Sequence, residues 1–342
     1  MSFSKEKRNH IRFYILEKIE SGRKNPAKAA SESFGISLNT AYRYIREMAE
    51  EGILCRQGSS YVLANSRQLI TLRRSEGELT SEDTIFVQRI QPAFHDLPQN
   101  ILTIWQYAFT EMMNNAIDHS EAESVSVEIC RNFLNTTLVI EDDGVGIFRK
   151  LKDFFGFDTS GEAVRELFKG KLTTDQTRHS GEGIFFTSRA VDKFAAVSEG
   201  RIFSHDRFDD VVQDFTGCTL MEHWMDMPGT AVFMSLSNFS NKTLKEIFDQ
   251  YSSVDEGFFR TSIPIKNMFD MFPVARSQAR RLCQNFDKFR EIELDFEGVE
   301  EVGQGFAHEL FVVYRNSHPE IRLVPVNTND AVEKMIRRVQ IS

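Results

Sequence analysis

The stretch Thr110-Glu111-Met112-Met113-Asn114-Asn115-Ala116-Ile117-Asp118-His119 places polar and apolar residues at helical spacing. Because residues four apart share one face of a helix, Glu111, Asn115 and His119 are expected to form a row, with Asp118 beside it. A carboxylate and a carboxamide one turn apart can hold a divalent cation through oxygen and leave a carboxylate available as a base. The pattern therefore predicts a functional site on an amphipathic helix.

Three glycine-containing segments follow this helix. Residues 139–147 predict an apolar strand that runs into an acidic turn, where glycine permits close backbone approach or positive φ. Residues 180–187 predict a glycine turn at the start of a helix, whose free N–H groups favour phosphate. Residues 229–236 predict a turn that opens a core strand. The glycines of the first two turns are Gly144, Gly146, Gly181 and Gly183.

The order of these four segments resembles the GHKL nucleotide-binding fold, which type II topoisomerase ATPase subunits, heat-shock chaperone ATPases, mismatch-repair clamps and histidine kinases share. The resemblance covers roughly residues 80–240. It implies ATP and Mg²⁺ as ligands, with Asn115 binding Mg²⁺ and Glu111 polarising the attacking water. Histidine kinases carry Asn at the position of Glu111, which argues against that branch of the family.

The same resemblance implies roles for further residues. Asp142 would bind the adenine amino group, and Thr230 would assist through water. Lys171 and Arg178 would reach phosphate from the interval that corresponds to the family's lid. The second glycine turn departs from the family pattern, because Ile184 follows where a third glycine is usual. The remaining nucleotide-binding candidates are Asp118, Gly144, Gly146, Gly181 and Gly183.

Composition and charge suggest more than one domain. The chain has 342 residues, 41% of them hydrophobic, and no apolar run approaches the roughly 20 residues of a membrane helix. Its four cysteines lack metal-ligand spacing, so reduced thiols in a cytoplasmic protein are expected. Residues 1–74 hold 14 Lys and Arg against 7 Glu and no Asp, whereas the rest of the chain holds 27 basic and 43 acidic residues. A basic end on an acidic body indicates an anionic partner at the N-terminus.

Residues 1–75 resemble the winged helix-turn-helix domain of bacterial transcription regulators. Helices are expected near 5–20, from Pro26 and over 38–48, followed by a hairpin over 53–63. In that family the second helix of the motif enters the major groove of double-stranded DNA. A winged helix used for dimerisation or protein contact remains the alternative. The DNA-binding candidates are Asn39, Thr40, Tyr42, Arg43, Arg46 and Arg56.

The predicted fold class is α+β and multidomain. A GHKL α/β sandwich is expected over residues 76–245, and strands alternating with helices predict a small α/β domain over 246–342. The latter resembles the STAS-like domain found beside GHKL ATPases. In the similar STAS anti-sigma antagonists, a Ser at the start of the corresponding helix receives phosphate from a GHKL serine kinase. The stretch Val302-Gly303-Gln304-Gly305-Phe306 has no hydroxyl, so a module that docks a protein partner or receives a signal is expected instead.

The leading functional interpretation is a DNA-binding regulator whose GHKL domain binds and slowly hydrolyses Mg-ATP, acting as a homodimer. One alternative is an anti-sigma-type serine/threonine kinase that acts on a separate protein. Another is a nucleotide-sensing adaptor without turnover. The sequence alone leaves these alternatives open.

Overall fold

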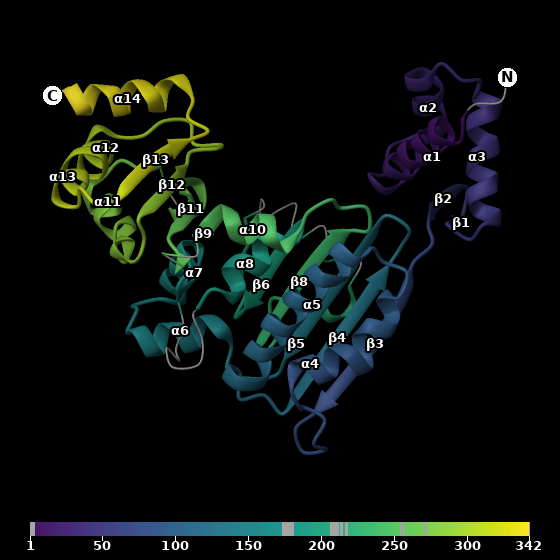
Figure 1. Cartoon of the computed structure of the whole chain (residues 1–342), viewed down its shortest axis with the longest axis horizontal. Helices are drawn as coiled ribbons and strands as arrows, with labels where there is room; N and C mark the ends of the chain where they lie inside the picture. Colours follow the sequence, from purple (N-terminus) through teal and green to yellow (C-terminus); the bar gives the residue numbers. More distant parts are fainter. Residues whose placement is uncertain are drawn as a thin grey trace.

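The structure is a computed structural model that describes residues 4–172, 181–205, 212, 215, 218–253, 255, 257–269 and 272–341. Figure 1 shows three units: a helical N-terminal unit, a central unit built on one large sheet, and a C-terminal unit that packs against the central one. The predicted α+β class is confirmed. In the described part of the chain, every helix is too short or too polar to cross a membrane.

The N-terminal unit is a three-helix bundle followed by a hairpin. Its elements are α1 (Lys5–Glu20), α2 (Pro26–Phe34), α3 (Leu38–Glu50), β1 (Leu54–Gln57) and β2 (Ser60–Leu63), and the last two pair antiparallel. Gly35 ends α2 in the left-handed conformation at φ 61°, and Ser37 then caps α3 by accepting from the Thr40 N–H at 3.2 Å. One side of α3 is buried through Ala41, Tyr44, Ile45 and Met48.

The central unit is a six-stranded antiparallel sheet in the order β3-β4-β5-β8-β6-β7. Its strands are β3 (Ser66–Arg73), β4 (Ser124–Arg131), β5 (Asn135–Asp142), β6 (Lys193–Ser198), β7 (Arg201–Phe203) and β8 (Thr230–Ser237). Strand β3 pairs with β4 from Ser66 to Arg73. These residues lie within the predicted domain 1–75, so the N-terminal unit ends ahead of its predicted boundary.

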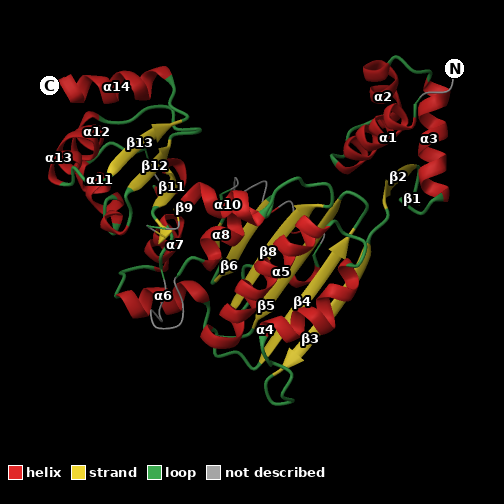
Figure 2. Cartoon of the chain, in the orientation of Figure 1, coloured by secondary structure: helices red, strands yellow, loops and turns green. Residues whose placement is uncertain are grey.

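Helices cover one face of this sheet, as Figure 2 shows for α4, α5 and α8. The helical elements are α4 (Glu82–Ile85), α5 (Gln99–Asn114), α6 (Ile147–Phe155), α7 (Ser160–Lys169), α8 (Gly183–Ala190) and α10 (Leu244–Tyr251). Helix α5 continues into a π-helical turn over Asn115–His119. Buried aromatic rings, among them Trp105 and Phe109 of α5, fill the space between helices and sheet. The helix that was predicted from the opening motif therefore lies directly on the sheet.

The C-terminal unit is a three-stranded parallel sheet with helices around it. Its elements are β11 (Arg260–Pro264), α11 (Arg276–Leu282), β12 (Glu291–Asp295), α12 (Gln304–His308), α13 (Arg315–Ser317), β13 (Arg322–Val326) and α14 (Asp330–Ile341), and two short strands, β9 (Ser252–Ser253) and β10 (Gly257–Phe258), precede it. A π-helical turn over Glu309–Tyr314 extends α12 towards its C-terminal end. The rings of Phe258 and Phe185 of α8 lie 4.5 Å apart between centroids, so one apolar core runs from the central unit into this one.

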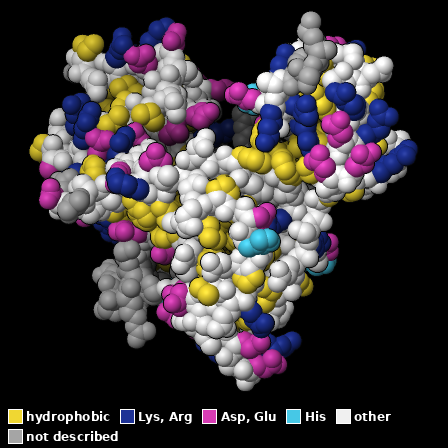
Figure 3. All heavy atoms as spheres, turned by 45° about the vertical axis from the view of Figure 1, so that its right-hand side comes forward, with side chains coloured by type: hydrophobic (Ala, Val, Ile, Leu, Met, Phe, Trp, Pro, Cys, Tyr) yellow, Lys and Arg dark blue, Asp and Glu magenta, His cyan; other side chains and the backbone are white. Residues whose placement is uncertain are grey.

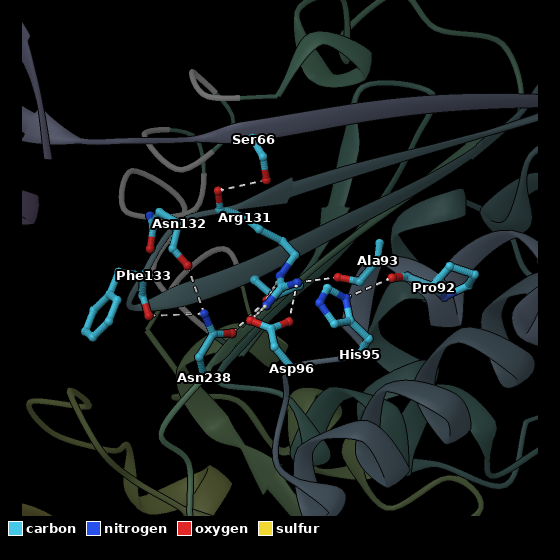
Figure 4. Close-up of polar contacts among 10 residues, drawn as sticks. Ser66, Pro92, Ala93, His95, Asp96, Arg131, Asn132, Phe133 and Asn238 are labelled. Carbon is cyan, nitrogen blue, oxygen red and sulfur yellow. Dashed lines mark hydrogen bonds and ion pairs between the residues drawn. The ribbon is translucent and has the colours of Figure 1, made fainter. Parts of the chain in front are cut away.

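The turn between β4 and β5 joins the N-terminal unit to the central sheet. Leu134 at its tip is 3% exposed and packs in the core of the N-terminal unit. Figure 4 shows how the base of the turn is held: the Asn238 amide donates to the carbonyls of Asn132 and Phe133 at 2.9 and 3.3 Å. The Arg131 guanidinium donates to Asp96 at 2.9 Å beside it. These hydrogen bonds fix the conformation of the turn in which Leu134 packs into the core of the N-terminal unit.

Candidate functional site

A pocket of about 360 Å³ lies where the end of α5, the turn after β5, the start of β8 and the start of α8 meet. Its apolar wall contains side chains from the sheet and from the surrounding helices, and its polar groups come from separate segments of the chain. The sequence-predicted residues that line it are Glu111, Asn115, Asp142, Gly146, Gly181, Gly183 and Thr230. Four segments that are distant in sequence therefore form one site.

Asp142 provides the buried carboxylate of the pocket. Its side chain is 5% exposed, and Oδ1 accepts the Gly144 N–H at 2.9 Å. Burial raises the pKa of this carboxyl from 3.8 to about 6, although the hydrogen bonds from the backbone N–H groups of Gly144 and Thr230 oppose that rise. Asp142 pairs with Thr230 across β5 and β8, and the Thr230 hydroxyl accepts the Ile147 N–H at 2.9 Å. A carboxylate held in this way can accept a hydrogen bond from a ligand amino group.

At two positions of the acidic turn, the surrounding atoms leave no room for a side chain. A Cβ on Gly144 would lie 2.0 Å from the Ser120 carbonyl oxygen. Gly146 has φ +82°, and a Cβ there would lie 2.6 Å from Ser198 Oγ. Gly144 does not line the pocket itself, but its close contact with Ser120 brings the turn against the end of the α5 helix. Both glycines therefore shape the site, as predicted for the turn.

Glu111 and Asn115 occupy the other side of the pocket. A Cβ on Gly183, the first residue of α8, would lie only 2.2 Å from Glu111 Oε2. The Glu111 carboxylate thus lies against the N-terminus of α8. Asn115 begins the π-helical turn, and both it and His119 still line the pocket although the helical repeat changes between them and Glu111.

Sequence reasoning missed the lysine at this pocket. Lys150 lies in the first turn of α6 and lines the cavity, with Nζ donating to the His119 carbonyl at 2.5 Å and 3.5 Å from Glu121. Its position, directly after the glycines of the acidic turn, is the signal that could have identified it. Lys150 therefore adds a positive charge to the lining of the pocket.

Three predicted residues require correction or comment. Asp118 is exposed and does not line the pocket, because the π-helical turn rotates it outward. Lys171 points away from the cavity: its ammonium donates to the Lys288 carbonyl at 2.9 Å and lies 5.2 Å from the Phe258 ring. Arg178, the other residue predicted to reach phosphate, lies outside the described residues.

Comparison with known families agrees with this geometry. Residues 102–217 match the family described as histidine kinase-, DNA gyrase B- and HSP90-like ATPase. The central unit contains a GHKL-type ATPase domain. Residues 278–333 match the STAS-like domain of unknown function (DUF4325), so the C-terminal unit is STAS-like. No match was found among the curated proteins.

The GHKL-type domain lacks a preformed protein cage for a metal: in residues 4–172 and the other described ranges, no three His, Cys, Asp or Glu side chains cluster suitably. Mg²⁺ does not need such a cage, since it is commonly bound through one or two protein ligands together with substrate phosphates. The Asn115 side chain is an oxygen donor that lines the pocket together with Glu111. The residues present therefore fit Mg²⁺ that arrives with a nucleotide.

A second candidate surface lies on the N-terminal unit, where Figure 3 shows Lys and Arg side chains gathered. The predicted DNA-binding residues lie on α3 and in the hairpin, and all except half-buried Thr40 are exposed. Arg43 forms an i,i+4 ion pair with Glu47 at 3.5 Å, and Arg56 Nε donates to the Gly58 carbonyl at 3.2 Å. The exposed members of the set are Asn39, Tyr42, Arg43, Arg46 and Arg56.

Proposed function

We propose that this chain is a DNA-binding regulator whose GHKL-type domain binds Mg-ATP and hydrolyses it slowly. The observation that carries the proposal is the meeting of Asp142, Glu111 and Asn115 around one pocket. A buried carboxylate suits an amino group at one end, and a carboxylate beside a carboxamide suits a metal-bound phosphate at the other.

The adenine end of the proposed site is apolar and has few polar groups. Asp142 accepts the hydrogen bond of the adenine amino group, and Thr230 lies beside it in the sheet. Ile140 and Val232 line the same wall and exclude water from the base. These contacts favour a purine with an amino group at C6, as in adenine, because the C6 carbonyl of guanine has no hydrogen to donate to Asp142.

The phosphate end has the groups that hydrolysis requires. ATP, when bound, supplies the phosphoanhydride bond that is cleaved. Glu111 orients and deprotonates the attacking water, general-base help that is worth about 10²–10⁴-fold. Asn115 would hold Mg²⁺, and the N–H groups at the start of α8 would stabilise anionic oxygen. Lys150 offsets part of the negative charge of Glu111 and the nucleotide.

The N-terminal unit supports the DNA-binding part of the proposal. The unit has three helices followed by a hairpin, with a polar and basic outer face on α3, which is the arrangement expected if it is a winged helix. The N-terminal side chains of α3 would enter the major groove, where Asn39 suits adenine and Arg43 or Arg46 suits guanine. A homodimer on a palindromic site is the simplest assembly for such a unit.

The deciding experiment measures ATP binding and phosphate release by the purified chain with Mg²⁺, with and without duplex DNA. By linkage, DNA that alters ATP affinity must have its own affinity altered by the same factor. ATP affinity or turnover that responds to DNA supports the proposal. A stable phosphoprotein formed from labelled ATP and cell extract would assign the chain to the anti-sigma-type kinases instead. Binding without turnover that ignores DNA would indicate a nucleotide-sensing adaptor.

A further inference from the structure

Helix α7 carries a buried ion pair at its C-terminal end, where the helix contacts the STAS-like unit. Lys169 is 1% exposed, and its ammonium contacts the Glu166 carboxylate at 2.5 Å. The same ammonium donates to the carbonyl oxygens of Arg281 and Gln284, at 3.5 and 2.9 Å. The Asn285 amide donates to Glu166 at 2.9 Å, so the STAS-like unit completes the hydrogen bonding of both charges.

Helix α8 is fixed to the same unit at its far end. Arg189 Nη2 donates to the Ser262 carbonyl of β11 at 3.0 Å, and its guanidinium lies 3.4 Å from the Phe185 ring centroid. Between the two helices, a Cβ on Gly170 would lie 2.9 Å from Phe185 and 3.0 Å from Phe258. Both helices therefore pack closely against the STAS-like unit.

Close backbone contacts lead from this junction back to the pocket. Lys171 Nζ donates to the Lys288 carbonyl, and the next residue, Leu172, lines the pocket. Gly181 has φ +72° and packs on Leu172, since a Cβ there would lie 2.7 Å from the Leu172 backbone nitrogen. Gly181 precedes the Gly183 that contacts Glu111. The adenine end, by contrast, is built from β5 and β8 of the central sheet.

We propose that the STAS-like unit positions the phosphate side of the nucleotide pocket, with Lys169 and Arg189 as positioning residues that act through α7 and α8. The inference rests on the proposed nucleotide binding and deepens it. Displacing the STAS-like unit, for instance by a protein partner that docks on it, changes affinity for ATP and leaves affinity for adenosine nearly constant. By reciprocity, ATP favours the docked position of the unit whereas adenosine does not.

The test compares dissociation constants for ATP and for adenosine in the full chain. The variant Glu166→Gln with Lys169→Met removes the ion pair as a whole, because deleting one partner would leave an unpaired buried charge. Neither side chain lines the pocket, so neither contacts the ligand. The expected result is ATP affinity lowered by about tenfold, a typical coupling between sites, with adenosine affinity unchanged. Lys334→Met is the matched control, since Lys334 is an exposed lysine of α14 in the same unit.

A milder change keeps the proposal falsifiable if the double variant fails to fold. Thr261→Val in β11 removes the hydroxyl that donates to the Lys169 carbonyl at 2.8 Å and keeps the shape of the side chain. A smaller loss of ATP affinity, again with adenosine unchanged, is expected. An unaltered ratio of the two affinities in Thr261→Val and in any folded double variant overturns the inference. If wild type binds neither ligand, the proposed function itself fails, which is a distinguishable result.

Discussion

Glu111 occupies the space that a side chain at position 183 would need, since a Cβ on Gly183 would lie 2.2 Å from Glu111 Oε2. The two residues come from α5 and α8, far apart in the sequence. Their contact places the proposed catalytic carboxylate against the helix N-terminus that would face the phosphates. The absence of a side chain at Gly183 therefore leaves room for the Glu111 carboxylate.

Substituting Gly183→Ala tests this contact. The added methyl group must displace the Glu111 carboxylate, and a misplacement of about 1 Å typically costs 10²-fold in rate. We expect phosphate release to fall by about 100-fold while adenosine binding persists. Gly161→Ala is the matched control, because a Cβ on Gly161 of α7 finds its nearest atom at 3.4 Å. Normal turnover in Gly183→Ala would contradict the assigned position of Glu111.

Replacing Glu111 with Gln separates catalysis from binding. The amide keeps the size of the side chain but cannot accept a proton from water, so turnover should fall by about 10²–10⁴-fold. ATP affinity, measured by calorimetry, should stay within a few-fold of wild type. Glu32→Gln on the exposed face of α2 serves as control. If turnover survives in Glu111→Gln, another group is the base.

We expect Asp142 to make nucleotide binding dependent on pH. Its pKa is raised to about 6 by burial, and a ligand amino group binds the ionised form. Protonation below pH 6 therefore competes with binding, and the affinity for adenosine should fall towards tenfold per pH unit. Adenosine is the suitable ligand because it carries no phosphate that titrates. Titrations at pH 5, 6 and 8 check the expected order, and equal affinity at all three would exclude Asp142 from the site.

The variant Asp142→Asn provides the control for that titration and has a second consequence. The raised pKa means that the folded protein favours the protonated carboxyl, so stability from this group is present below pH 4 and lost as pH rises through 6. Asp142→Asn should therefore raise the free energy of unfolding at pH 8 by about 1–3 kcal/mol. In this variant, adenosine binding should be weak and should no longer depend on pH.

Arg43 and Arg46 test the DNA surface. The double variant Arg43→Ala with Arg46→Ala should bind duplex DNA more weakly. The slope of log affinity against log salt concentration should also fall, by about one unit for each phosphate that is no longer neutralised. Fluorescence anisotropy over a range of salt concentrations measures this slope, with Lys334→Ala as control. A slope equal to that of wild type would assign the N-terminal unit to protein contacts.

Leu134 tests how the N-terminal unit is joined to the ATPase domain. Leu134→Ala leaves a cavity in the N-terminal core at a cost of about 2–5 kcal/mol, although the residue belongs to the central chain segment. We expect the N-terminal unit to become sensitive to proteolysis while adenosine binding is retained. Leu69→Ala on β3 is the control, since Leu69 is 56% exposed. Coincident loss of both properties would show that the two units unfold together.

The sequence predicted the polar half of the site from spacing alone, because the row from Glu111 to Asn115 is local to one helix. The same reasoning placed Asp118 in the site, and it failed there because a π-helical turn changes the repeat after Asn114. Lys171 was assigned from its charge and its place in the family pattern, and its true contact, the Lys288 carbonyl, is 117 residues away. The charge of a residue does not reveal which way its side chain points in the folded protein.

The sequence by itself determined the local features: the helical row, the glycine turns, the helices and hairpin of the N-terminal unit and the uneven distribution of charge. These depend on residues a few positions apart, whose backbone conformations and periodicity are properties of short segments. Tertiary structure alone decided which side chains meet. Lys150 lines the pocket, Leu134 packs in the N-terminal core, and Lys169 is buried against the STAS-like unit. Those contacts arise from the packing of distant elements, where desolvation and close fit determine each partner.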